Sequence, residues 1–119
     1  MPLFRGINVV SIGVPDLDRA KDFYGRVLDL GDPVFDMPEV GWIEFSTGAT
    51  SGNISITTEG WDPSTRSNTT VVLNTVDCRE ACEKLRSLGV KCDDPVELPG
   101  YVVFCTFYDP FGNRLQMCS

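Results

Sequence analysis

Residues 14–24 read VPDLDRAKDFY, and a similar stretch, VDCREA, follows at residues 76–81, with Asp77 lying 61 residues after Asp16. Asp16 and Asp77 take the same place in the two stretches. The same separation relates residues 53–56, NISI, to residues 114–117, RLQM. A repeat at a fixed period indicates two copies of one supersecondary unit that pack together.

The first copy predicts a strand, a helix and three further strands. Apolar residues recur at helical spacing after Asp16, which suits an N-cap, until Gly31 and Pro33 end the run. Short apolar runs between glycines and prolines predict the strands. The expected elements are a strand over 7–14, a helix from about 17 to 28, and strands at 33–37, 41–47 and 52–58.

A polar connector, residues 59–67, leads to a second copy with the same order of elements. The expected elements are a strand at 69–76, a helix from Asp77 to about Leu88 that ends at Gly89, and strands near 90–97, 101–108 and 113–118. We also match residues 41–45, GWIEF, with residues 100–104, GYVVF, because both carry aromatics at their ends.

These patterns predict one α+β domain over residues 1–119, built from tandem βαβββ modules at about 6–58 and 68–118. Each module is expected to bend its sheet into a half-barrel beneath one helix. The first core should contain Val10, Ile12, Val14, Ala20, Phe23, Val27, Phe45, Ile54 and Ile56. The second should contain Val71, Leu73, Ala81, Leu85, Phe104, Leu115 and Met117.

Charge restricts the classes of partner. The net charge of −7 repels phosphate backbones and anionic lipids, so we expect no nucleic-acid or membrane partner. No long apolar run follows the N-terminal residues, which predicts no signal peptide or membrane span and a cytoplasmic protein.

The chain has five cysteines, all in the second half, and no histidine. An odd number of cysteines without a signal peptide argues against a disulfide scaffold. Cys78 and Cys82 share one face of the expected helix, where they could bind a soft metal, form a redox pair or fill the core. We favour core filling, because buried free cysteines are common. The lack of histidine removes the commonest metal ligand and general base.

Residues 14–24 and 108–116, YDPFGNRLQ, resemble signature stretches of the vicinal oxygen chelate superfamily. That superfamily contains glyoxalase, the bleomycin- and fosfomycin-resistance proteins, extradiol dioxygenases and methylmalonyl-CoA epimerase. The resemblance implies the paired βαβββ fold over essentially the whole chain. Its residues are mainly structural, so they do not identify a reaction.

The resemblance also implies where a metal would lie, because metal-dependent members take one ligand from the first and one from the last strand of each half. Here those positions hold Val9, Ser55, Thr70 and Gln116. Valine cannot coordinate, neutral hydroxyls are poor ligands, and one amide oxygen does not hold a divalent ion against water. We therefore expect no metal and no cofactor there.

Strand alternation predicts the side chains that line the cup of the sheets. They are Ile7, Val9, Ser11, Trp42, Glu44, Asn53, Ser55, Thr57, Thr70, Val72, Asn74, Tyr101, Val103, Arg114 and Gln116. Such a lining suits a small, partly planar polar organic molecule. Trp42 and Tyr101 could stack on it, or could fill a core or a dimer contact. Arg114 could clamp an anionic group, or pair with Glu44 at the rim.

Glu44 is the one candidate acid or base in this lining, unless it faces solvent beside a cation. Three functions stay open: metal-free binding of a small molecule, a metal-independent isomerase or lyase using Glu44, and a degenerate glyoxalase- or dioxygenase-type enzyme with displaced ligands such as Glu44 and Gln116. Val9 and the lack of histidine favour the first. Uncovered sheet edges predict a homodimer, with the cavity built within one chain or across two.

Overall fold

The computed structural model describes residues 3, 5–49, 52–65 and 67–119. The chain divides into two compact units, residues 1–64 and 65–119. This division falls inside the polar connector that the sequence predicts at 59–67. The union of both modules in one domain stays a prediction.

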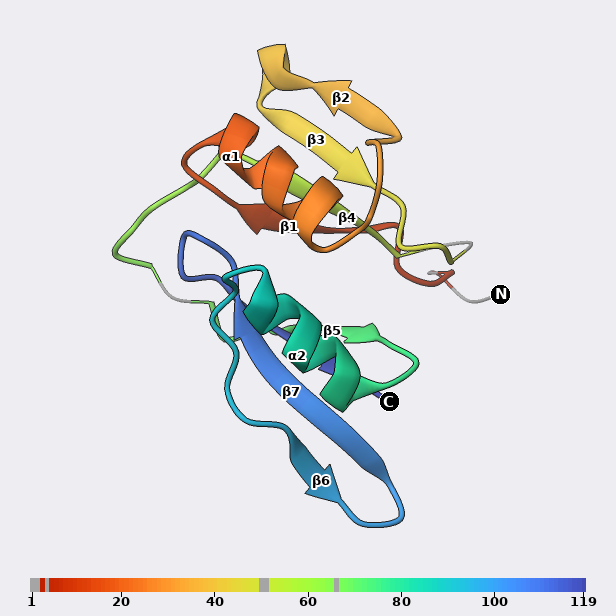
Figure 1. The fold of residues 1–119 in the computed structure, drawn as a ribbon. Helices are drawn as coiled ribbons and strands as arrows, with labels where there is room; N and C mark the ends of the chain where they lie inside the picture. Colours follow the sequence, from red (N-terminus) through yellow and green to blue (C-terminus); the bar gives the residue numbers. More distant parts are fainter. Residues whose placement is uncertain (1–2, 4, 50–51, 66) are drawn as a thin grey trace. The chain divides into compact units, whose positions relative to one another are not determined.

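The first unit is a four-stranded mixed sheet with a helical segment on one face (Figure 1). The strand order is β1-β4-β3-β2, and β1 runs parallel to β4 while the other pairs are antiparallel. Its elements are β1 (Val9–Gly13), α1 (Leu17–Asp22), the π-helical turn η1 (Phe23–Val27), β2 (Phe35–Met37), the 3-10 turn η2 (Pro38–Val40), β3 (Trp42–Phe45) and β4 (Asn53–Thr57).

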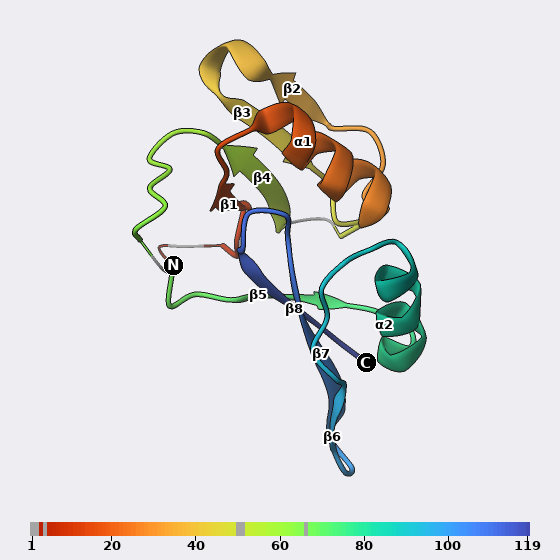
Figure 2. The same cartoon turned by 60° about the vertical axis from the view of Figure 1, so that its left-hand side comes forward.

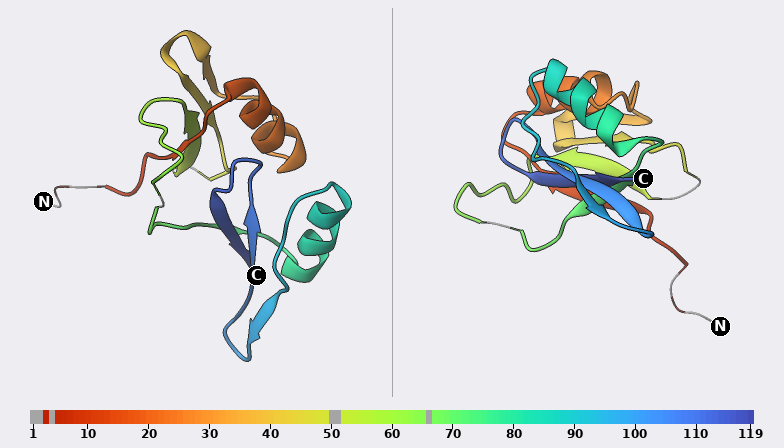
Figure 3. Two further views of the ribbon diagram at one scale, coloured as in Figure 1. Left: turned by 90° about the vertical axis from the view of Figure 1, so that its left-hand side faces the viewer. Right: turned by 60° about the horizontal axis from the view of Figure 1, so that its bottom comes forward.

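The second unit repeats this arrangement, with the order β5-β8-β7-β6 and a parallel β5–β8 pair. Its elements are β5 (Val71–Asn74), α2 (Cys78–Ser87), β6 (Val96–Leu98), β7 (Val102–Tyr108) and β8 (Arg114–Cys118). The hairpin of β6 and β7, pale blue in Figure 3, extends past the end of α2. These two mixed sheets confirm the predicted α+β fold of tandem βαβββ modules.

The strand predicted at 90–97 is wrong for most of its length. Only an isolated bridge joins Cys92 to Phe107 before β6 begins at Val96. Pro95 lies between them and has no N–H group to donate to a ladder, which separates the bridge from the strand.

Both helices begin at the predicted caps. The Asp16 carboxylate accepts from the Arg19 backbone N–H at 3.1 Å, and that of Asp77 accepts from the Glu80 N–H at 3.1 Å. These bonds satisfy donors that the first turn leaves without partners. At the other end of α2, Gly89 adopts a left-handed φ of 86°, as a residue after a helix often does.

In the first helical segment α1 changes directly into the π-helical turn η1. The Leu28 N–H donates to the carbonyl of Phe23, five residues earlier, at 2.9 Å. A π turn accommodates one more residue than an α turn. This turn explains why the first helical segment, α1 with η1, is longer than α2.

Each core lies between the helix and one face of the sheet (Figures 1 and 2). The buried apolar residues of the first unit are Ile12, Val14, Ala20, Phe23, Tyr24, Ile43, Phe45, Ile54 and Ile56. Those of the second are Cys78, Cys82, Leu85, Val90, Cys105, Phe107, Leu115 and Met117. Val10, Val27, Val71, Leu73 and Ala81, also expected in the cores, are half-buried.

Phe104 is a correction to the predicted core. It lies in register with Cys118 and Val96, one position away from the buried Cys105. Because side chains alternate along β7, Phe104 occupies the face opposite to Cys105 and Phe107.

Among the described residues, no helix is long and apolar enough to span a bilayer.

Candidate functional site

The first sheet carries polar side chains on the face opposite to the core. One row across it reads Ser11, Ser55, Glu44 and Phe35, and the next includes Thr57, Trp42 and Met37. We call this set, with Val9 and its register partner Asn53, the polar face. It includes every member of the cup lining predicted on β1, β3 and β4. Phe35 and Met37 were missed, because β2 has only three residues and shows little alternation.

Glu44 is the centre of a hydrogen-bond network on the polar face. One carboxylate oxygen accepts from the indole N–H of Trp42 at 3.1 Å, and the other accepts from the Asn53 amide at 2.9 Å. The residue is only 7% exposed. The interpretation of Glu44 as a solvent-facing residue is therefore wrong. Two donors on neighbouring positions fix the orientation of the carboxylate, because each oxygen has its own partner.

Ser11 and Ser55 form a second contact on this face. Their hydroxyl oxygens lie 2.6 Å apart, and either one can donate. Ser55 is fully buried on β4, whereas Ser11 on β1 is exposed. A buried hydroxyl needs a partner, and Ser11 supplies it from the adjacent strand.

The second unit shows fewer contacts between the predicted site residues. The Gln116 amide donates to the Thr106 hydroxyl at 3.0 Å, on the face that also carries Phe104. The Asn74 amide oxygen accepts a weak bond from the Cys118 thiol at 3.8 Å. Thr70 is half-buried just before β5, and Arg114 is exposed at the start of β8. Thr106 was missed as a partner of Gln116.

Tyr101 and Val103 are corrections to the predicted lining. Tyr101 lies in the turn before β7 and is 91% exposed, so it does not belong to the strand. Val103 shares its face with Cys105 and Phe107, which are buried on the helix side.

The register identifies the residue that corresponds to Trp42. Trp42 pairs with Thr57, and the repeat mate of Thr57 is Cys118, which pairs with Phe104. Phe104 is thus the counterpart of Trp42. The match between 41–45 and 100–104 was shifted by three residues, and the apolar alternation of Cys105 and Phe107 was the signal that could have corrected it.

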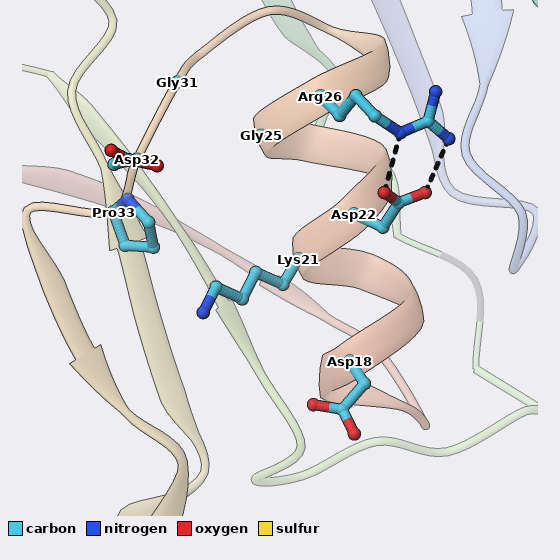
Figure 4. Close-up of a pocket in the computed structure, with 8 residues that line it drawn as sticks. All are labelled: Asp18, Lys21, Asp22, Gly25, Arg26, Gly31, Asp32 and Pro33. Atoms are coloured by element: carbon cyan, nitrogen blue, oxygen red, sulfur yellow. Dashed lines mark hydrogen bonds and ion pairs between the residues drawn. The ribbon is translucent and has the colours of Figure 1, made fainter.

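A separate depression of about 380 Å³ lies beside α1 (Figure 4). Its walls carry exposed charges, including Asp22, which bonds Arg26 at 2.8 Å, and Lys21, which reaches Asp36 at 2.6 Å. The hydrogen bond from Arg26 lowers the pKa of Asp22, and the one to Asp36 raises the pKa of Lys21. Exposed pairs of this kind contribute little energy, and none of the described residues that line the depression is a buried polar group that could select a ligand.

The structure and the sequence together place the chain in one class of protein. It belongs to the Glyoxalase/Bleomycin resistance protein/Dioxygenase superfamily, whose family model matches residues 6–117. No curated protein matches the sequence significantly.

Solved structures of similar proteins cover nearly the whole chain. A glyoxalase/bleomycin resistance protein from Streptomyces sp. CB03234 is 26% identical, with a TM-score of 0.75, over 96% of this chain and 100% of its own. TnmS3, an antibiotic binding protein from the same organism, is 24% identical, with a TM-score of 0.80, over 98% and 97%. A superfamily member from Sphaerobacter thermophilus DSM 20745 is 21% identical, with a TM-score of 0.78, over 98% of each chain.

The residues at the implied metal positions do not fit a divalent ion. Val9 has no donor atom, the Ser55 hydroxyl is bonded to Ser11, and the Gln116 amide is bonded to Thr106. Thr70 adds only a neutral hydroxyl. Imidazoles and carboxylates are the usual ligands of a divalent ion in such a site, and these four positions offer neither.

Proposed function

We propose that this protein binds a small, partly planar polar organic molecule on the polar face of its first unit, without a divalent metal at Val9, Ser55, Thr70 and Gln116. The observation that carries the proposal is the fixed network of Glu44, Trp42 and Asn53. It presents an aromatic ring, a carboxylate and an amide side by side on one sheet face. Binding sites commonly combine apolar surface with a few polar groups held in place.

The relatives support binding of organic molecules. One similar structure is an antibiotic binding protein, and the family's description includes bleomycin resistance. An antibiotic is therefore a reasonable class of ligand for this chain. Within the second unit taken by itself, Asn74, Arg114 and Gln116 remain proposed ligand contacts, and Phe104 takes the place of Tyr101 as the proposed aromatic contact there.

Catalysis by Glu44 has less support than binding. A general base needs an oxygen within hydrogen-bond reach of the proton that it removes. Both Glu44 oxygens already accept bonds from protein donors. Glu44 is also disfavoured as a displaced metal ligand, because its bonded and register partners Trp42, Asn53 and Ser55 are neutral and a lone carboxylate is a weak site for a divalent ion. We therefore propose that Glu44 holds Trp42 and Asn53 in place, and that these two side chains contact the ligand.

We also propose a homodimer that acts in the cytoplasm. The edge strands carry exposed apolar side chains, Phe35 and Met37 on β2 and Val96 and Leu98 on β6. Uncovered edges of this kind favour pairing with another chain. All five cysteines are described, and all are free thiols, which suits a reducing compartment.

Tryptophan fluorescence tests the binding proposal. The chain has two tryptophans, so Trp61→Phe leaves Trp42 as the reporter, and Trp42→Phe is the matched control. We expect saturable quenching of Trp42 by bleomycin or by members of a panel of planar polar compounds, in buffer with excess chelator. Quenching that is equal in Trp42→Phe, or that needs an added divalent ion, would contradict the proposal.

A further inference from the structure

Three cysteines from different parts of the second unit converge at one place. Cys82 lies on α2, Cys105 on β7, and Cys92 in the segment that bridges to Phe107. Their sulfur atoms all lie within 4.8 Å of one another. Three sulfurs bound about 2.3 Å from a shared ion in a trigonal plane lie roughly 4 Å apart. Small side-chain rotations would therefore bring all three to one ion.

The surroundings of this cysteine cluster favour a soft ion. The carbonyl oxygen of Asp93 accepts weak bonds from Cys105 at 3.3 Å and Cys82 at 3.9 Å. Among the described residues, the cluster contributes only sulfur as a side-chain ligand atom. Cys82 and Cys105 are buried and Cys92 is half-buried, so Cys92 is the most accessible of the three thiols.

A cation lies beside the cluster. The guanidinium of Arg86 donates to the Cys92 carbonyl at 3.0 Å, and it also pairs with Asp94 at 2.9 Å. Three thiolates around a monovalent ion carry net negative charge, and a neighbouring guanidinium reduces the cost of burying it.

We propose that Cys82, Cys92 and Cys105 form a three-coordinate site for copper(I), independent of the small-molecule site on the polar face. Thiolates select copper(I) and zinc among the common ions. Zinc in structural sites almost always takes four ligands, and the chain has no histidine to supply a fourth. On binding, each thiol loses its proton to solvent as a copper–sulfur bond forms, and copper stays in its monovalent state.

The test is a competition between the full-length protein and bicinchoninate, a coloured copper(I) chelator, under anaerobic reducing conditions. We expect the protein to withdraw one copper(I) per chain. Cys82→Ser, Cys92→Ser and Cys105→Ser should each weaken binding by more than the roughly tenfold to hundredfold that loss of an outer contact costs. Cys118→Ser, which changes a half-buried cysteine outside the cluster, should bind like the unmodified protein.

Thiol protection tests the site without any variant that might unfold. Alkylation is run long enough to modify the buried thiols of the copper-free protein and is mapped by mass spectrometry. After copper(I) loading it should spare Cys82, Cys92 and Cys105, and it should modify Cys118 equally in both forms. The proposal is overturned if the chelator keeps the copper, if Cys118→Ser weakens binding as much as the cluster variants, or if the protected thiols are not these three. Zinc binding to the three thiols while copper(I) does not bind would also overturn it.

Discussion

Among single residues, Glu44 determines the chemistry of the polar face, because its carboxylate accepts hydrogen bonds from the side chains of Trp42 and Asn53. The sequence predicted where this side chain lies from the alternation of β3. It could not predict the partners, because an acidic residue on a strand is usually paired with a cation or with water. Here the partners are an indole and an amide, which only the register of β3 with β4 brings together.

Replacing Glu44 tests this network. In Glu44→Gln an NH2 group takes the place of one acceptor oxygen. This donor group then faces the N–H donor of Trp42 or Asn53, which loses its acceptor. We expect the free energy of unfolding to fall by about 1–3 kcal/mol in urea denaturation, because one buried donor loses its partner. Glu39→Gln in η2 is the control, since Glu39 is exposed. Equal stability of both variants would show that the network contributes nothing.

The thiols of the cysteine cluster give a prediction about pH. Burial raises the pKa of Cys92 to about 11 and that of Cys105 to about 12. These thiols are thus protonated at neutral pH in the metal-free protein, and the thiolate is the reactive form. With a disulfide reagent at pH 8, we expect Cys92 and Cys105 to react more slowly than Cys118, and to accelerate as the pH rises toward 11. Rapid reaction of Cys105 at pH 8 would contradict the burial.

At the scale of elements, the packing of each helix on its sheet was largely predictable. Which β7 side chains face the helix was not. Polar and apolar residues alternate clearly in β4, where Ile54 and Ile56 flank Ser55. In β7 the run VVFCTFY has apolar residues on both faces. Matching its aromatic residues to Gly41–Phe45 therefore assigned the β7 side chains to the wrong faces of the sheet. β6 was misplaced because the sequence pattern does not reveal that pairing stops around Pro95.

Truncation of the helix contacts tests the cores. Phe23 of η1 and Leu85 of α2 are both buried against their own sheets. Phe23→Ala and Leu85→Ala should each lower the free energy of unfolding by about 2–5 kcal/mol, because each leaves a cavity. Val76→Ala is the control, since Val76 is 100% exposed. Thermal or urea denaturation in which Phe23→Ala matches the control would show that η1 does not pack as described.

For the whole molecule, the proposed homodimer depends on the edge strands. Phe35 on β2 and Leu98 on β6 are large, apolar and exposed. We expect light scattering to give twice the chain mass at micromolar concentration. Phe35→Glu or Leu98→Glu should shift the protein toward the monomer, because a charge would be buried at the interface. Val76→Glu, outside the edge strands, should leave the mass unchanged, and a monomeric unmodified protein would refute the dimer.

The central claim is metal-independent binding of an organic molecule on the polar face. It is tested most directly by amide chemical shifts of isotope-labelled protein, titrated with bleomycin and a panel of planar polar compounds in excess chelator. We predict saturable shifts for at least one compound, concentrated on β1, β3 and β4 around Ser11, Glu44 and Ser55. Shifts that appear only after a divalent ion is added, or that cluster away from these strands, would contradict the claim.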